Sequence, residues 1–179
     1  VRNAPEKLFV THFEGVMPPT LITGDSAEIA EFRQIHKDII VKPLFGNGGA
    51  GVFHITEGDE HLNALLEMFT QLYREPVIVQ RYIPEIVTGG DARVILVDGE
   101  PVPFALARIP TATDNRGNLA AGATGVTRPL DDPDRFLASQ IGPRIAGLGM
   151  LFVGLDVIGG FVTAINVTSP TGLRAIDKQ

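Results

Sequence analysis

Residues 153–170, VGLDVIGGFVTAINVTSP, consist of two apolar segments separated by Gly159 and Gly160. This pattern is typical of a β-hairpin, because glycines support a tight turn between two strands. Each segment also carries a polar side chain in its interior, Asp156 and Asn166. Burying an unpaired carboxylate or amide is costly, so each of these side chains needs a partner. The partner is either the other side chain or a ligand.

The register of this hairpin decides between the two interpretations. If the turn has three residues, 159–161, Asp156 lies opposite Ala164 and Asn166 follows on the same face. A two-residue turn would change the faces. In the first register the two polar side chains present oxygen atoms side by side, as Mg²⁺ requires, with phosphate oxygens completing its shell. The alternative is a hydrogen-bonded pair at the rim of the sheet, and the two residues alone favour it.

The composition indicates a globular protein. The chain has 179 residues, 44% of them hydrophobic and 20% charged, which is enough apolar material for one or two cores. The net charge is −6 and the basic residues are scattered singly, so we predict no nucleic-acid partner. No apolar run or signal peptide indicates a membrane partner. The absence of cysteine fits a reducing cytoplasm, where we expect the protein to reside.

Helical and strand patterns alternate along the chain. We predict helices over 26–36 and 59–73, and a helix over 132–149 that Pro143 kinks or divides. Strands are predicted over 38–45, from residue 52, over 76–83, and as a hairpin around Asp98-Gly99. Residues 111–129 are polar and glycine-rich, and we predict a mobile lid there. The result is an α+β fold with largely antiparallel sheets, in two sublobes, 1–83 and 84–179.

Two further stretches could bind a nucleotide. In VKPLFGNGGAGVF, glycines 46, 48, 49 and 51 would let backbone N–H groups approach an anion, and Lys42 supplies a positive charge. The alternative is a flexible hairpin tip, because neither the dinucleotide nor the phosphate-loop pattern is satisfied. In VIVQRYIP, residues 80–83 could read the edge of a flat heterocycle at the end of a buried strand. The alternative there is an ordinary core strand.

Arginines mark the third candidate site. Arg93 and Arg108 lie on the two strands of one predicted hairpin, flanked by apolar residues, and Arg116 with Asn118 lies in the predicted lid. Guanidinium groups in such positions bind carboxylate or phosphate in a bidentate manner. The alternative is an ion pair with Asp91 or Asp98.

Six stretches together resemble, in order and spacing, the ATP-grasp portion of bacterial glutathione synthetases. They are NAPEKLF, IIVKPLFGNGGAGVF, VQRYIP, GDARVILVDGEPVPFALARIP, RGNLAAG and GLDVIGGFVTAINVTSPTG. They cover nearly the whole chain, and RGNLAAG and INVTSPTG are the most specific of them. The resemblance implies an ATP-grasp fold and an ATP-dependent ligase. Such an enzyme phosphorylates γ-glutamylcysteine, and the amine of glycine attacks the acyl phosphate to give glutathione.

The resemblance also implies roles for individual residues. ATP would be held by Lys7, Lys42, Gly46, Gly48, Gly49, Gln80, Arg81, Tyr82, Ile83 and Asp91. Arg93 and Arg108 would be catalytic, and the peptide and phosphate would be held by Arg93, Arg116, Asn118, Ser169 and Thr171. Asp156 and Asn166 would bind Mg²⁺ or Mn²⁺. The implied cofactors are ATP and this metal ion, the implied substrates are γ-glutamylcysteine and glycine, and full-length members are expected to form homo-oligomers.

The chain departs from the family pattern at one decisive position. The family has Glu-x-Asn on the metal strand, where this chain has Ala164-Ile165-Asn166. A methyl group cannot replace the carboxylate that bridges two Mg²⁺ ions, so we expect weak metal binding and impaired phosphoryl transfer. Smaller departures are Ala92 in place of lysine, Thr124 in place of arginine, and Phe45 in place of Asp or Tyr.

The sequence also bears on whether the chain is a fragment and on which other functions are open. Residue 1 is not Met, and an N-terminal domain of roughly a hundred residues is expected from the family, so we expect a fragment. One alternative is a nucleotide-binding or regulatory module without ligase turnover. Another is an ATP-grasp ligase for a different acid and amine, against which RGNLAAG and NVTSPTG argue.

Overall fold

The computed structural model describes residues 4–46, 49–111, 122–168 and 170–176. The chain forms two compact units, Pro18–Ile83 and a second made of Val1–Met17 with Pro84–Gln179. Both contain an antiparallel sheet with helices, so the predicted α+β class is confirmed. A division at residue 84 was expected, but residues 1–17 were predicted in the other sublobe. They join the C-terminal unit because helix α1 (Glu6–Phe9) packs on strand β9 (Phe161–Asn166).

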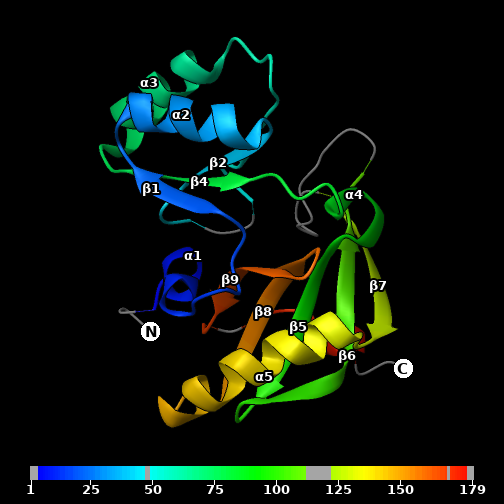
Figure 1. Cartoon of the computed structure of the whole chain (residues 1–179). Helices are drawn as coiled ribbons and strands as arrows, with labels where there is room; N and C mark the ends of the chain where they lie inside the picture. The colour runs from blue at the N-terminus through cyan, green and yellow to red at the C-terminus, as the bar shows by residue number, and fades with distance from the viewer. Residues whose placement is uncertain (1–3, 47–48, 112–121, 169, 177–179) are drawn as a thin grey trace. The chain divides into compact units, whose positions relative to one another are not determined.

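The unit Pro18–Ile83 has a four-stranded sheet in the order β1-β4-β2-β3. Its strands are Thr20–Thr23 (β1), Ile39–Pro43 (β2), Phe53–Ile55 (β3) and Val77–Arg81 (β4). Helices α2 (Ser26–His36) and α3 (Leu62–Tyr73) cover one face, where a buried apolar cluster includes Ile29 and Phe69 (Figure 1). Helix α2 has the predicted bounds. Helix α3 begins later than predicted, because the Asp59 carboxylate accepts the His61 N–H and stabilises a turn.

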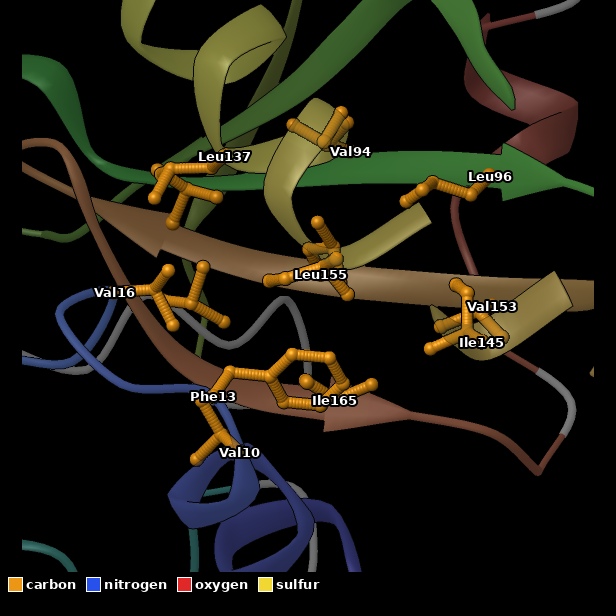
Figure 2. Close-up of a cluster of buried hydrophobic side chains, with 14 of the residues drawn as sticks. Val10, Phe13, Val16, Val94, Leu96, Leu137, Ile145, Val153, Leu155 and Ile165 are labelled. Carbon is orange, nitrogen blue, oxygen red and sulfur yellow. The ribbon is translucent and has the colours of Figure 1, made fainter. Parts of the chain in front are cut away.

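The second unit has a five-stranded antiparallel sheet in the order β7-β6-β5-β8-β9. Its other strands are Asp91–Val97 (β5), Glu100–Ile109 (β6), Thr124–Pro129 (β7) and Phe152–Ile158 (β8). Helix α5 (Asp132–Gly147), helix α1 and the short 3₁₀ helix Val10–His12 pack against one face. Figure 2 shows the core there, in which Ile145 of α5 lies beside Val153 of β8, and the same cluster includes Leu137, Val94 and Leu155.

Two short helices complete this unit. Helix α4 (Ile86–Gly89) precedes β5, and α6 (Leu173–Ile176), which was not predicted, packs Ile176 against Ile95 and Leu106. Helix α5 continues through Pro143 as one element. Among the described residues, no helix has the length and apolar character that crossing a bilayer requires.

Part of the predicted lid is a strand. Residues 124–129 form β7, which pairs with β6 from Phe104 to Ile109, so the prediction of an irregular segment through residue 129 was wrong. The ten-residue strand β6 offers a long row of backbone groups on its outer side, and β7 pairs with part of this row, using the strand-forming residues Thr124, Val126 and Thr127. The rest of the predicted lid, residues 112–121, lies outside the described residues.

Both predicted hairpins combine a two-residue turn with an irregularity in register, which lies between Val94 and Leu96 in the β5–β6 pair. At Asp98-Gly99 the loop has two residues with φ angles of 50° and 82°, as predicted for a primed turn. The turn between β8 and β9 also has two residues, because Ile158 pairs with Phe161, so the second of the two turns considered from the sequence is the one that forms. A β-bulge then leaves Thr163 unpaired between two pairs and restores the opposition of Asp156 and Ala164.

The contact between Gly99 and Gly142 gives a stability prediction. A Cβ at Gly142 would lie 2.1 Å from the Gly99 carbonyl oxygen, whereas a Cβ at Gly147, in the same helix, would meet nothing within 4 Å. We expect Gly142→Ala to lower the free energy of unfolding by at least about 2 kcal/mol in urea titrations. Gly147→Ala is the matched control and should be neutral or stabilising by up to about 1 kcal/mol. Equal effects of the two substitutions would contradict this packing.

Candidate functional site

The five-stranded sheet gathers charged side chains on the face opposite helix α5. Its register pairs Asp91 with Arg108, Arg93 with Asp156, and Asp156 with Ala164. Residues that pair across antiparallel strands project from the same face, so these side chains meet. We call the group formed by Asp91, Arg93, Arg108, Asp156 and Asn166 the arginine–aspartate cluster.

Asp156 is the centre of this cluster. Its Oδ1 accepts hydrogen bonds from Arg93 Nε at 2.6 Å and from Arg108 Nη2 at 2.7 Å. Its Oδ2 accepts one from Asn166 Nδ2 at 3.1 Å. Asp156 and Asn166 therefore lie on the same face, as the predicted register requires. The ion pair that the sequence left open is also present, because Arg108 Nη2 lies 2.7 Å from Asp91 Oδ2.

Glycine makes room for Arg93. A Cβ at Gly154 would lie 2.8 Å from Arg93 Cδ and 2.8 Å from Pro170 Cβ. The arginine side chain runs through this space, and its Nη1 donates to the Thr171 carbonyl oxygen at 3.2 Å. The sequence analysis missed Gly154, although a glycine inside a strand is a signal of close approach.

Burial and charge act in opposite directions on the two carboxylates. Burial, with the Asp156 charge added, raises the pKa of Asp91 to about 6 against the opposing effect of Arg108. Burial acts in the same direction on Asp156, but Arg108 and Arg93 outweigh it and hold the pKa of Asp156 below its usual value. The pKa of Arg108 is raised, because the attraction of both carboxylates exceeds the effect of burial. The cluster thus keeps Asp156 ionised.

Some polar atoms of the cluster have no protein partner. Within the described residues, Arg93 and Arg108 make no other side-chain hydrogen bonds, which leaves Nη2 of Arg93 and Nη1 of Arg108 available as donors. The buried Oδ1 of Asp91 accepts no hydrogen bond. The cluster can therefore bind a ligand that carries an anionic group and a nearby donor.

The oxygen atoms available for a divalent cation are few. Both lone pairs of Asp156 Oδ1 are used by guanidinium groups, and Oδ2 keeps one lone pair beside the Asn166 amide nitrogen. Ala164, opposite Asp156, contributes only a methyl group. Within the described part of the chain, no group of three histidine, aspartate or glutamate side chains could hold a metal. Mg²⁺ prefers several oxygen ligands, so the cluster as it stands does not fit this ion.

The unit Pro18–Ile83 carries a second polar arrangement. The buried Lys42 Nζ donates to Gln80 Oε1 at 2.5 Å, and Gln80 Nε2 donates to Thr20 Oγ1 at 2.8 Å. Strand β4 lies between β1 and β2, which brings these three side chains onto one face. The Tyr82 ring stacks on His54, with ring centroids 3.8 Å apart. Neither Thr20 nor His54 was predicted from the sequence.

The other predicted site residues are placed as follows. Lys7 is buried on α1, and burial lowers its pKa despite the opposing effect of Glu6. Ile83 is buried, Arg81 ends β4, and Gly46 and Gly49 have positive φ angles of 108° and 78°. The exposed Thr171 contributes its carbonyl oxygen to Arg93. Gly48, Arg116, Asn118 and Ser169 lie outside the described residues.

The fold is that of ATP-grasp proteins. The chain is similar to the ATP-grasp ligase PsnB, solved with a minimal precursor, Mg and ADP, with a TM-score of 0.62 and 20% identity over 90% of this chain and 47% of that one. It is also similar to the D-cycloserine synthetase DcsG, with a TM-score of 0.74 and 18% identity over 94% of this chain and 64% of that one. At such identities the likeness establishes the fold alone.

Sequence similarity defines the family. Residues 6–179 match the family described as prokaryotic glutathione synthetase, ATP-grasp domain, and the chain belongs to this family. It is 53% identical over 178 residues to the glutathione synthetase of Brucella melitensis and 49% identical over 178 residues to that of Pseudomonas aeruginosa. These matches cover 99% of this chain and 56% of each relative. The chain thus spans about half the length of the curated relatives it matches.

The raised pKa of Asp91 gives a pH prediction. The folded state binds the Asp91 proton more tightly than the unfolded state, so its contribution to stability is present below the usual value of 3.8 and is lost as pH rises through about 6. We therefore expect the stability of the wild type, measured relative to Asp91→Asn by urea unfolding, to fall between pH 4 and pH 7. The fall should be about 3 kcal/mol. A difference that stays constant or grows over this range would contradict the assignment.

Proposed function

We propose that this chain is the ATP-grasp region of an ATP-dependent ligase that joins γ-glutamylcysteine and glycine to form glutathione. The observation that carries this proposal is the pair of buried arginines that share Asp156, each with one terminal nitrogen left for an anion. A ligase of this kind must hold a substrate carboxylate beside the phosphates of ATP, and guanidinium groups are suited to both. The curated relatives are named glutathione synthetases, and this supports the proposed acid and amine.

The two units supply different parts of this function. In the unit Pro18–Ile83, Lys42 and the glycines that follow it would hold ATP phosphates, and residues 80–83 would contact adenine. In the other unit, Asp91 would accept a hydrogen bond from the ribose, because its Oδ1 has no partner among the described residues. Lys7 would hold phosphate, and Arg116, Asn118, Ser169 and Thr171 would contact the peptide. A reducing cytoplasm is the compartment we propose, since the chain has no cysteine.

This chain's own residues would act by orienting a charged substrate and by stabilising negative charge during the reaction. The free guanidinium donors of Arg93 and Arg108 would orient the attacking carboxylate and stabilise negative charge on an acyl phosphate. Asp156 would fix the positions of both guanidinium groups through the hydrogen bonds that its Oδ1 accepts. Because the cluster as it stands does not fit Mg²⁺, we derive no step that depends on a metal ion.

Ala164 supports a second candidate function. With Ala164 in place of the family's glutamate, the cluster lacks the carboxylate expected at the metal strand. A chain that binds ATP without turning it over would act as a nucleotide-binding or regulatory module. The two candidates differ in a simple observation, because only the ligase releases ADP when both substrates are present.

Nucleotide binding is tested by changing Lys42. We expect Lys42→Met to weaken ATP binding by about tenfold or more in calorimetric titrations, since it removes a buried positive charge while keeping the length of the side chain. Lys37→Met is the matched control, because Lys37 is exposed and pairs with Glu57 on the surface. Similar affinities for the wild type and Lys42→Met would contradict the proposed role of Lys42.

Ligase activity is tested by restoring the family residue. We expect Ala164→Glu to raise ADP release in the presence of ATP, Mg²⁺, γ-glutamylcysteine and glycine by about tenfold or more, because it adds a carboxylate opposite Asp156. Ala164→Gln has a side chain of similar size without the charge and should give no rise. If Ala164→Glu remains folded, as circular dichroism would show, and releases no more ADP than the wild type, the result would contradict the ligase proposal.

A further inference from the structure

We infer that the arginine–aspartate cluster of this chain binds the phosphates of metal-free ATP at least as tightly as those of ATP complexed with Mg²⁺. This inference rests on the proposed function, because it assumes that ATP is the ligand. It goes further by naming the form of ATP that the chain recognises. Most enzymes that transfer phosphoryl groups hold Mg²⁺ with one or two carboxylates together with the phosphates. In the cluster, Asp156 keeps one lone pair on Oδ2, and the other carboxylate oxygen without a hydrogen bond among the described residues, Asp91 Oδ1, is the one proposed to meet the ribose.

The count of available oxygens is the first step. Asp156 Oδ1 is used by two guanidinium groups at 2.6 and 2.7 Å, and the Asn166 amide turns its nitrogen toward Oδ2. Coordination of a metal ion by both residues would require the Asn166 amide to rotate and give up its bond to Asp156. Ala164 is buried opposite Asp156 and offers no oxygen in compensation.

The charge of the cluster is the second step. Asp91 and Asp156 carry one negative charge each when ionised, and Arg93 and Arg108 carry one positive charge each, so the cluster is neutral. A divalent cation near Asp156 would face both guanidinium groups without a net negative charge to attract it. The buried arginines are only 6% and 5% exposed, so water screens this repulsion poorly.

The free donors are the third step. Arg93 Nη2 and Arg108 Nη1 have no protein partner within the described residues and can bond phosphate oxygens directly. Mg²⁺ on ATP occupies phosphate oxygens and lowers their negative charge, which weakens the bonds that the two guanidinium groups make to these oxygens. Where protein carboxylates hold the metal ion, their coordination of Mg²⁺ offsets the weaker bonds between guanidinium groups and phosphate. In this cluster the offset is missing, so Mg²⁺ should not tighten ATP binding.

Calorimetric titration of the wild-type chain with ATP tests the inference, once with excess Mg²⁺ and once with EDTA. We expect Kd with Mg²⁺ to be equal to or larger than Kd with EDTA. Tightening by Mg²⁺ of more than about threefold would overturn the inference. In Ala164→Glu we expect Mg²⁺ to tighten binding by about tenfold, and in Ala164→Gln we expect no tightening.

Binding of a metal alone provides the second measurement, which tests without nucleotide whether the cluster holds a metal ion. Mn²⁺ is titrated into the wild-type chain without nucleotide and followed by electron paramagnetic resonance. We expect no saturable site with a Kd below about 1 mM. Such a site, lost in Asp156→Asn, would overturn the inference. Failure of ATP to bind under both conditions would instead contradict the proposed function, so the two failures are distinguishable.

Discussion

The hydrogen bonds of two buried guanidinium groups to one oxygen of Asp156 are the interaction on which the site depends. They join β5, β6 and β8, and Arg93 extends the connection to the Thr171 carbonyl. Removing any one of these charges would leave the others buried without compensation, which is far more costly than losing a surface ion pair. Asp156 therefore orders the polar face of the sheet, and the direction in which its side chain points is set by the strand register.

That register depends on a small irregularity. With a two-residue turn at Gly159-Gly160 and no bulge, Asp156 would lie opposite Thr163. Asn166 would then project from the other face of the sheet, because side chains alternate along a strand. The unpaired Thr163 restores the alternation, and Thr163 Oγ1 donates to the Asp156 carbonyl oxygen at 3.3 Å. The apolar side of the same strands, with Leu155 and Ile165, then faces the core beneath α5 and α1. The bulge thus places Asn166 on the same face as Asp156, while Ile165 points into the core on the other face.

The strong local patterns of the sequence were sufficient to predict much of this fold. Helix α2 and the Asp98-Gly99 hairpin follow from a cap, a helical stripe and a primed turn, all of which depend on neighbouring residues. Strand β7 and the position of residues 1–17 could not be predicted, since they depend on what a distant edge or face offers as a partner. The opposition of Asp156 and Ala164 was expected only for a three-residue turn, but a two-residue turn with a bulge produces it, and a bulge leaves no clear mark in the sequence.

The candidate site, too, could be predicted from the sequence only in part. The residue types of the cluster and the decisive alanine were visible in the sequence, and so was the possibility of an ion pair between Arg108 and Asp91. The number of lone pairs that the arginines leave on Asp156 was not, because it depends on which nitrogen points at which oxygen. That count is the basis for proposing that Asp156 and Asn166 belong to a charge-balanced cluster, whereas their role as metal ligands stays a prediction.

The most direct measurement is anomalous diffraction from crystals of the chain grown with ATP and Mn²⁺. The account predicts that Arg93 and Arg108 remain on Asp156 Oδ1 and that no manganese peak lies within coordination distance of Asp156 and Asn166. A manganese ion bound by both side chains, with the guanidinium groups displaced from Oδ1, would contradict it.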